Sequence, residues 1–176
     1  AGGTLVDTAA AYGSGEAERM IGSVLRSHLR RDDLVLATKA GFSVRGGRRT
    51  VDTSRRAMLR ELEGSLRRLG VDHIDLWQVH AWDDATPIEE TLAACDLAVA
   101  SGRTRYIGIS NFSGWQTAQA ATWQRAWPGR TPIVSTQVEY SLLQRGVERE
   151  VVPAAEALDM ARQLLAQGRI SREHLH

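Results

Sequence analysis

The feature that most constrains the fold is a repeat in which short apolar runs rich in β-forming residues alternate with segments of helical spacing. Successive runs start 27 to 40 residues apart. Runs that are almost continuously apolar are typical of strands covered on both faces, which points to parallel strands joined by right-handed helical crossovers. The runs are TLVDT (4–8), LVLATK (34–39), IDLWQVH (74–80), YIGIS (106–110) and IVSTQV (133–138).

The intervening segments carry the apolar spacing and the end signals of amphipathic helices. A Thr-Ser pair precedes the second segment and Gly70 ends it. Thr86 and Glu89 resemble a capping box at the start of the third, Gly102 ends it, and Ser113 is a cap for the fourth. The predicted helices therefore lie within 15–29, 53–70, 86–102 and 113–127.

Five β/α units agree with either of two α/β architectures. An open doubly wound sheet has the right number of units, but no G-x-G-x-x-G turn follows any strand, and the glycines of 13–22 match that spacing only loosely. A (β/α)₈ barrel takes about 250 residues. Five units in 176 residues would be part of such an α/β barrel.

Composition excludes several classes of function. A net charge of +1 gives no electrostatic reason to expect nucleic acid or an anionic membrane as a partner. The single cysteine, Cys95, excludes an intrachain disulfide and a Cys-rich metal site, and its helical context predicts a small buried residue. No metal is expected. No apolar run reaches the ~18–20 residues that span a bilayer, and without a signal peptide the expected compartment is the cytoplasm.

Polar side chains stand at the C-terminal ends of successive predicted strands. In α/β barrels and open α/β sheets this edge is where sites lie. Each residue alone has an ordinary explanation as a turn cap, a surface lysine or a buried histidine. Their recurrence at the same edge of five units favours a functional site. The residues are Asp7, Lys39, His80, Ser110, Asn111 and Gln137.

These residue types suit the protonation of an oxygen that becomes an alkoxide. Tyr12 follows Asp7 by five residues, and a phenol with a pKa near ~10 needs help to act as an acid. A neighbouring ammonium, here Lys39, favours the phenolate, and a carboxylate keeps the ammonium charged and oriented. A histidine at position 80 can hydrogen-bond a carbonyl or relay the proton. Ser, Asn and Gln side chains can hold a planar carboxamide such as that of nicotinamide.

Five motifs carry a resemblance to a known family. They resemble the aldo-keto reductase family, in its bacterial and potassium-channel β-subunit-like branch, in order and at family spacing over about residues 1–158. The resemblance implies a (β/α)₈ barrel that reduces aldehydes and ketones with NADPH. The motifs are D-T-A-x-x-Y-G (7–13), LATKAG (36–41), LGVDHIDLWQVHAWD (69–83), GRTRYIGISNFS (102–113) and STQVEYSLLQR (135–145).

The resemblance also implies individual roles. Tyr12 would be the proton donor, Asp7 and Lys39 the pair that tunes it, and His80 the group that orients the substrate. Trp82 would line the substrate pocket, or else pack at a strand end. The residues implied for the nicotinamide carboxamide are Ser110, Asn111 and Gln137.

The chain departs from the family pattern at both ends. It begins at the family's second strand, so its five units correspond to family strands two to six. Beyond 158 the pattern is lost, while apolar residues keep helical phase from Ala154 to Leu165. We divide the chain into a barrel segment, 1–158, and a C-terminal part, 159–176, which is either a helical extension or a discontinuous piece.

These departures carry further expectations. Strands at 4–8 and 133–138 would be open edges able to pair with another chain, so self-association is expected. The family's phosphate-binding strands seven and eight are not in the sequence, so NADPH binding by these 176 residues is expected to be weak or absent. Besides an active reductase, two alternatives stay open, namely a catalytically silent regulatory module like a channel β-subunit and an inactive truncated fragment.

Overall fold

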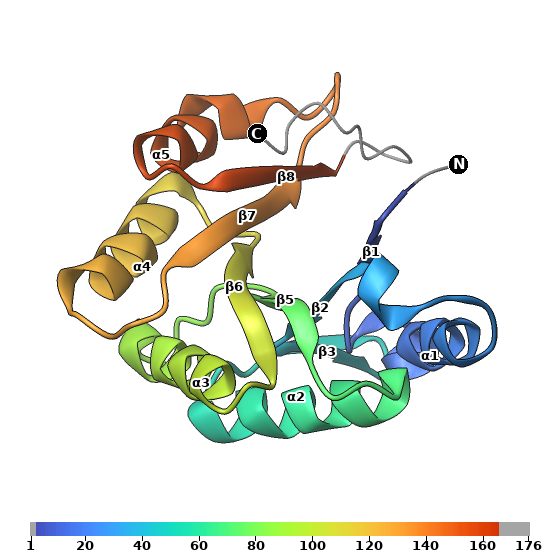
Figure 1. Ribbon diagram of the computed structural model, residues 1–176. Coiled ribbons are helices and arrows are strands. Elements are labelled where there is room, and N and C mark those ends of the chain that lie inside the picture. The colour runs from blue at the N-terminus through green and yellow to red at the C-terminus, as the bar shows by residue number, and fades with distance from the viewer. Residues whose placement is uncertain (1–2, 166–176) are drawn as a thin grey trace.

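The computed structural model describes residues 3–165, which build a curled parallel sheet with helices on its outer side (Figure 1). Six strands are hydrogen-bonded in the order β1-β2-β5-β6-β7-β8, all parallel. This is part of a (β/α)₈ barrel, and five of its strands coincide with the five predicted runs. The strands are β1 (Leu5–Asp7), β2 (Val35–Ala40), β5 (Ile74–Val79), β6 (Thr104–Ser110), β7 (Ile133–Glu139) and β8 (Ala161–Leu165).

The predicted helices form, and two predicted caps act as expected. Ser54 accepts a hydrogen bond from the N–H of Ala57, and Ser113 forms a capping box with Gln116. The predicted cap at Thr86 was wrong, because its hydroxyl donates instead to Asp83 Oδ2 at 2.8 Å. The α-helices are α1 (Glu16–His28), α2 (Arg55–Leu69), α3 (Ile88–Ala100), α4 (Gly114–Ala126) and α5 (Val151–Ala157); the 3₁₀ turns are η1 (Tyr12–Gly15), η2 (Arg31–Asp33) and η3 (Gly146–Arg149).

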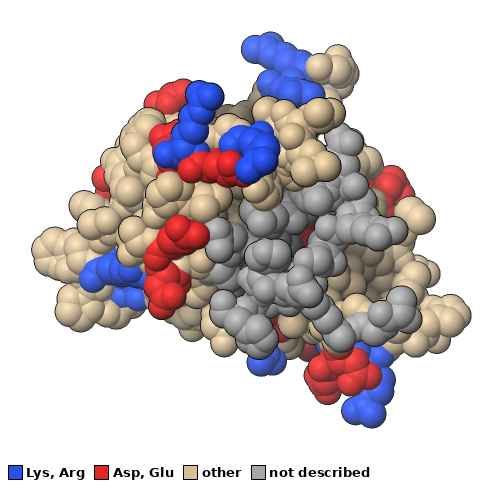
Figure 2. All heavy atoms as spheres, turned by 90° about the horizontal axis from the view of Figure 1, so that it is seen from above, with Lys and Arg blue, Asp and Glu red and all other residues tan. Residues whose placement is uncertain are grey.

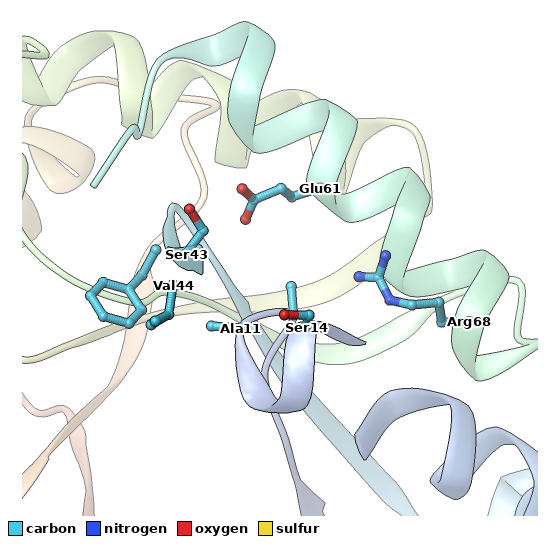
Figure 3. Close-up of a pocket in the computed structure, with 8 residues that line it drawn as sticks. Ala11, Ser14, Ser43, Val44, Glu61 and Arg68 are labelled. Carbon is cyan, nitrogen blue, oxygen red and sulfur yellow. The ribbon is translucent and has the colours of Figure 1, made fainter. Parts of the chain in front are cut away.

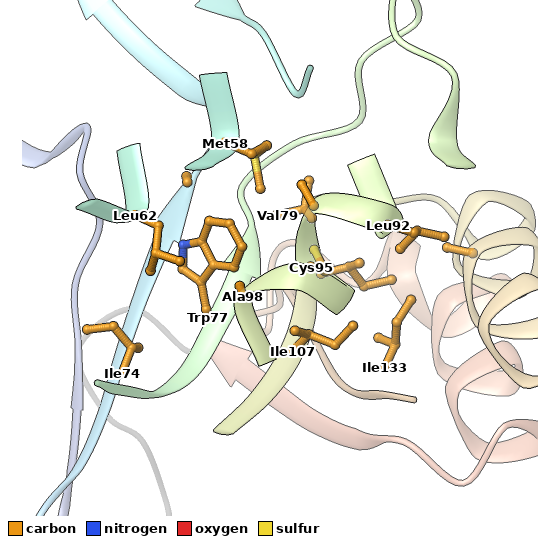
Figure 4. Packing of buried hydrophobic residues seen from close by; sticks show 14 of the residues in the cluster. Met58, Leu62, Ile74, Trp77, Val79, Leu92, Cys95, Ala98, Ile107 and Ile133 are labelled. Carbon is orange, nitrogen blue, oxygen red and sulfur yellow. The ribbon is translucent and has the colours of Figure 1, made fainter. Parts of the chain in front are cut away.

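The apolar core lies between the outer face of the sheet and the helices that cover it (Figure 4). Trp77 of β5 is fully buried there beside Leu62 of α2. Cys95 of α3 is buried in the same cluster, as predicted, and burial raises the pKa of its thiol to about 12. Burial of a side chain as large as Trp77 stabilises a fold by several kcal/mol, of the order of ~3–5 on truncation to alanine.

A hairpin between β2 and α2 was not predicted. Strands β3 (Phe42–Arg45) and β4 (Arg48–Val51) pair antiparallel around Gly46 and Gly47. Both glycines have positive φ, at 56° and 76°, which a two-residue hairpin turn of this kind requires. The hairpin stands apart from the barrel sheet and places Phe42 near the C-terminal ends of the strands.

The prediction that helix continues through residues 159–165 was wrong. Helix α5 ends at Ala157, and Asp159 has a φ of 48°, which turns the chain out of the helix. The N–H of Met160 then bonds to the carbonyl of Ala155 at 2.9 Å. The following residues form β8, which pairs with β7 from Ser135 to Glu139 and satisfies backbone groups that the edge of β7 would otherwise expose.

One of the two predicted open edges is therefore covered. Strand β1 lies at one edge of the sheet, as expected, but the other edge is β8 rather than β7. The rest of the predicted extension, 166–176, lies outside the described residues.

The surface carries both signs of charge. On the face seen in Figure 2, arginines and acidic residues lie interspersed rather than gathered into a field of one sign. Within residues 3–165, no helix combines the length and apolarity needed to cross a membrane.

Candidate active site

The C-terminal ends of the parallel strands bring the predicted residues together at one mouth of the sheet. Strand β1 ends at Asp7, β2 carries Lys39 near its end, and His80 directly follows β5. Ser110 ends β6 and lies in register with Gln137 of β7. In-register parallel pairing places side chains at the same height on the same face, so the arrangement follows from the sheet itself.

Lys39 is the buried centre of the site. Its side chain is only 1% exposed, and its Nζ donates to Asp7 Oδ2 at 2.7 Å and to the carbonyl of Thr8 at 2.9 Å. A buried ammonium is stable only when paired and hydrogen-bonded, and both conditions are met. Gln137 Nε2 donates to the same Asp7 oxygen at 3.1 Å and so helps to hold the carboxylate in place.

Tyr12 lies over this pair at the start of a tight turn. The turn after β1 runs through three residues of positive φ, Gly13, Ser14 and Gly15, at 56°, 55° and 93°. Left-handed backbone at a serine is strained, and such strain occurs where the surroundings dictate the conformation. The Tyr12 ring has Lys39 Nζ 5.2 Å from its centroid, and 42% of the residue is open to solvent.

His80 closes the other side of the mouth. Its N–H donates to the carbonyl of Ala40 at 2.9 Å, and its ring lies edge-on to Tyr12 with centroids 5.8 Å apart. The residue is 8% exposed, and its Nδ1 has no hydrogen-bond partner among the described residues. Burial, together with the charge of Lys39, lowers the pKa of His80 from 6.5 to about 4, so the imidazole is neutral at pH 7.

Ser110, Asn111 and Gln137 form a cluster of hydrogen-bonding groups beside His80. Asn111 has a φ of 57° and donates from Nδ2 to the carbonyl of His80 at 2.9 Å and to Ser110 Oγ at 3.1 Å. Its own N–H bonds the carbonyl of Gln137 at 2.9 Å. Gln137 Oε1 is buried without a partner within residues 3–165, which leaves an acceptor at this edge.

Trp82 lies two residues beyond His80, on the loop that leads to α3. Its indole N–H donates to Asp84 Oδ1 at 2.9 Å. Its ring packs edge-on against Phe112 and Trp115, with centroid distances of 5.2 and 5.3 Å. The ring is thus held at the rim of the mouth beside the segment that carries Asn111.

Phe42 contributes to the site and was missed from the sequence. Its ring centroid lies 5.1 Å from that of His80. The only sequence signal for the hairpin that positions Phe42 is the Gly46–Gly47 pair. The N–H of Gly41, the preceding residue, donates to Glu61 Oε2 at 2.8 Å and anchors this strand to α2.

A small cavity of about 170 Å³ lies behind the tyrosine turn (Figure 3). Ser14 of the turn, Ser43 of β3, and Glu61 and Arg68 of α2 line it. Burial raises the pKa of Glu61, while the Gly41 N–H that it accepts acts in the opposite direction. Arg68 is held by Glu18, with Nε 2.6 Å from Oε2.

Comparison with known proteins gives one consistent result. A sequence model described as "Aldo/keto reductase family" matches residues 1–175. Among curated proteins, the chain is 37% identical over 153 residues to the aldo-keto reductase YhdN of Bacillus subtilis, covering 87% of this chain and 44% of that protein. It is also 37% identical over 150 residues to L-glyceraldehyde 3-phosphate reductase of Escherichia coli, covering 83% and 43%.

Solved structures agree. The aldo-keto reductase AKR11C1 from Bacillus halodurans, in its holo form, superposes with a TM-score of 0.76 at 28% identity over 97% of this chain and 59% of that one. The glycerol dehydrogenase AKR11B4 from Gluconobacter oxydans gives 0.80 at 27% identity, covering 97% and 54%. The chain thus spans about half the length of the relatives it matches.

Proposed function

Because the chain belongs to the aldo/keto reductase family, we propose that it carries the carbonyl-reducing centre of an NADPH-dependent oxidoreductase. The substrate would be a small aldehyde or ketone and the product an alcohol. The observation that carries the proposal is the convergence of Asp7, Tyr12, Lys39 and His80 at one mouth of the sheet, linked by the 2.7 Å ion pair and the ring contacts around Lys39 and His80.

Tyr12 is the proposed proton donor. Reduction of a carbonyl by hydride leaves an alkoxide oxygen that needs a proton, and Tyr12 is the phenol at the mouth and is open to solvent on one side. When the phenol gives up its proton, the positive charge of Lys39 near its ring stabilises the negative charge left behind. Asp7 contributes by holding Lys39 in place.

His80 would act as a neutral hydrogen-bond donor to the substrate oxygen. Its lowered pKa means that the ring carries no charge at pH 7, so it can orient a carbonyl without competing with Tyr12 as a strong acid. Phe42 packs against the ring and limits its rotation.

The residues present fit a nicotinamide carboxamide. Gln137 Oε1, which has no partner within residues 3–165, can accept from the carboxamide NH₂, and the hydroxyl of Ser110, held by Asn111, can donate to the carboxamide oxygen. When bound, the reduced nicotinamide supplies the hydride. The preference for NADPH over NADH is proposed from the family resemblance.

We propose a cytoplasmic enzyme acting on a small molecule. The edge strands β1 and β8 leave backbone groups open to pairing with another chain. Size-exclusion chromatography over a hundredfold range of concentration tests this, because elution at the volume of a 19.3 kDa monomer throughout the range contradicts self-association.

The test of the reaction is the loss of reduced-nicotinamide absorbance with NADPH and a generic aldehyde. Tyr12→Phe should lower the rate by about 10²–10⁴-fold, the usual contribution of a positioned acid. Tyr106→Phe is the matched control, since Tyr106 is similarly exposed but lies on β6 away from Lys39 and His80.

The outcomes separate the alternatives. Activity that survives Tyr12→Phe but not other changes at the mouth contradicts the proton-donor role. No turnover by a folded protein of verified mass favours a catalytically silent module or an inactive fragment.

A further inference from the structure

A second cavity, of about 350 Å³, lies beside the mouth at the start of α3 and α4. The loop after β5 forms one wall and carries Trp82, Asp84 and the turn into α3. Trp115 and Gln119 of α4 form the facing wall, and Glu89 of α3 completes the lining. We call it the Trp82–Trp115 cavity.

The two tryptophans form a fixed aromatic corner. Their ring centroids are 5.3 Å apart with the planes at 66°, so the indoles meet at an angle rather than in a stack. The hydrogen bond from Trp82 Nε1 to Asp84 and the contact with buried Phe112 hold the first ring in place. Trp115 is 58% exposed, although burial of so large an apolar surface would stabilise the fold.

The ionisable side chains that line the cavity are all acidic. Asp84 uses Oδ1 for Trp82, and neither Asp84 nor Glu89 forms an ion pair with a basic residue in the described part of the chain. Neighbouring Asp83 differs, because its oxygens accept from the N–H groups of Thr53 and Ala85 and from the hydroxyls of Thr53 and Thr86, which makes it a structural carboxylate. Neither lysine nor arginine is among the residues that line the cavity.

We propose that the Trp82–Trp115 cavity binds an organic ammonium group. Indole faces attract cations through the ring quadrupole, and quaternary ammonium ligands are recognised in this way by aromatic cages. An anionic group would meet Asp84 and Glu89. A neutral apolar group would gain contact with the indoles but no electrostatic attraction, so charge separates the proposed ligand from an isostere of the same shape.

The position of the cavity extends the proposal to the substrate, and this step rests on the proposed function. Trp82 is two residues from His80, a separation that an extended chain spans in about 7 Å. A carbonyl compound held at Tyr12 and His80 could therefore place a second group against Trp82. We infer that the preferred substrates carry a positively charged amine near the carbonyl.

The binding test compares choline with 3,3-dimethylbutan-1-ol, a neutral molecule of nearly the same shape, by calorimetric titration of the folded protein. Choline should bind at least about tenfold more tightly, as expected when a desolvated cation meets indole faces. Trp115→Ala should weaken choline by about tenfold, and Glu89→Gln by a smaller factor. Trp127→Ala is the matched control, since Trp127 is equally exposed at 58% and lies outside the cavity.

Equal affinity for the two molecules, or equal effects of the Trp115 and Trp127 substitutions, overturns the cavity proposal. The turnover arm compares 4-(trimethylammonio)benzaldehyde with benzaldehyde. A higher kcat/KM for the cation that Trp115→Ala removes supports the substrate inference, and equal values overturn it. Choline binding without turnover of either aldehyde contradicts the proposed reaction and leaves the binding site standing.

Discussion

Replacing His80 should reduce the loss of unfolding free energy that occurs when the pH is lowered. In the folded chain burial and the charge of Lys39 lower the pKa of His80 from 6.5 to about 4. Above pH 6.5 the ring is neutral in both folded and unfolded chains, and its titration contributes nothing. As the pH falls from 6.5 to 4, this histidine becomes protonated in the unfolded chain but stays neutral in the folded chain. The free energy of unfolding therefore decreases over this range.

The magnitude follows from the pKa difference. At pH 5 the folded state should be less stable by about 2 kcal/mol than at pH 7.5 through His80 alone, and below pH 4 by about 3 kcal/mol. Because His80 is only 8% exposed, screening by solvent reduces this energy only slightly.

The assay is urea unfolding followed by circular dichroism at pH 7.5 and pH 5, for the parent chain and for His80→Gln. Carboxylates and the other histidines titrate alike in both proteins, so the difference between the two pH effects isolates His80. This includes His73, whose pKa is lowered by burial and by Arg31. The parent should lose about 2 kcal/mol more than the variant. Parallel losses would refute the view that His80 is held neutral in the mouth.

Three further predictions concern stability. Lys39→Met should lower the free energy of unfolding in urea by about 3–5 kcal/mol, because it leaves the buried Asp7 carboxylate without its cation. Adding Asp7→Asn should recover most of that loss, whereas additive losses from the two substitutions would contradict the pairing. Gly108→Ala should lower the stability measured by thermal unfolding by about 1–3 kcal/mol, because a Cβ there would lie 2.3 Å from Ser135 Oγ. Ser135→Ala in the same chain should restore part of the lost stability, and an unchanged Tm for Gly108→Ala would contradict this packing. Leu142→Ser should change the free energy of unfolding by less than about 0.5 kcal/mol, since the residue is 91% exposed, and it should raise the solubility of the protein. A larger loss of stability would mean that Leu142 packs against other residues in solution.

The strands and the candidate site could be predicted because both depend on local sequence and on one geometric rule. Apolar runs define the strands, and parallel pairing then brings every strand's C-terminal residue to one edge. The five runs and the five matching strands differ by at most two residues at either end. The contacts among Asp7, Lys39 and Gln137 follow from that edge, although a sequence pattern contains no distances.

The hairpin and the sixth strand could not be predicted for physical reasons. Around Gly46–Gly47 the flanking residues are mostly charged, and Val44 and Val51 are exposed, so no alternation of buried and exposed residues marks β3 and β4. Beyond Ala157 the apolar spacing fits helix and strand equally over a short stretch. The segment forms a strand because it pairs with the open edge of β7, and the spacing of residues within the segment carries no information about that tertiary partner.

Lys39 shows how composition can mark a site once burial is known. It is the only lysine in a chain whose other basic residues are arginines, and it is the basic side chain buried at the mouth. A compact ammonium has three rotatable donors, and two of them serve Asp7 and the Thr8 carbonyl. The same charge lies beside the Tyr12 ring and adds to the effect of burial in keeping His80 neutral, so one buried cation acts on both groups that would face a carbonyl.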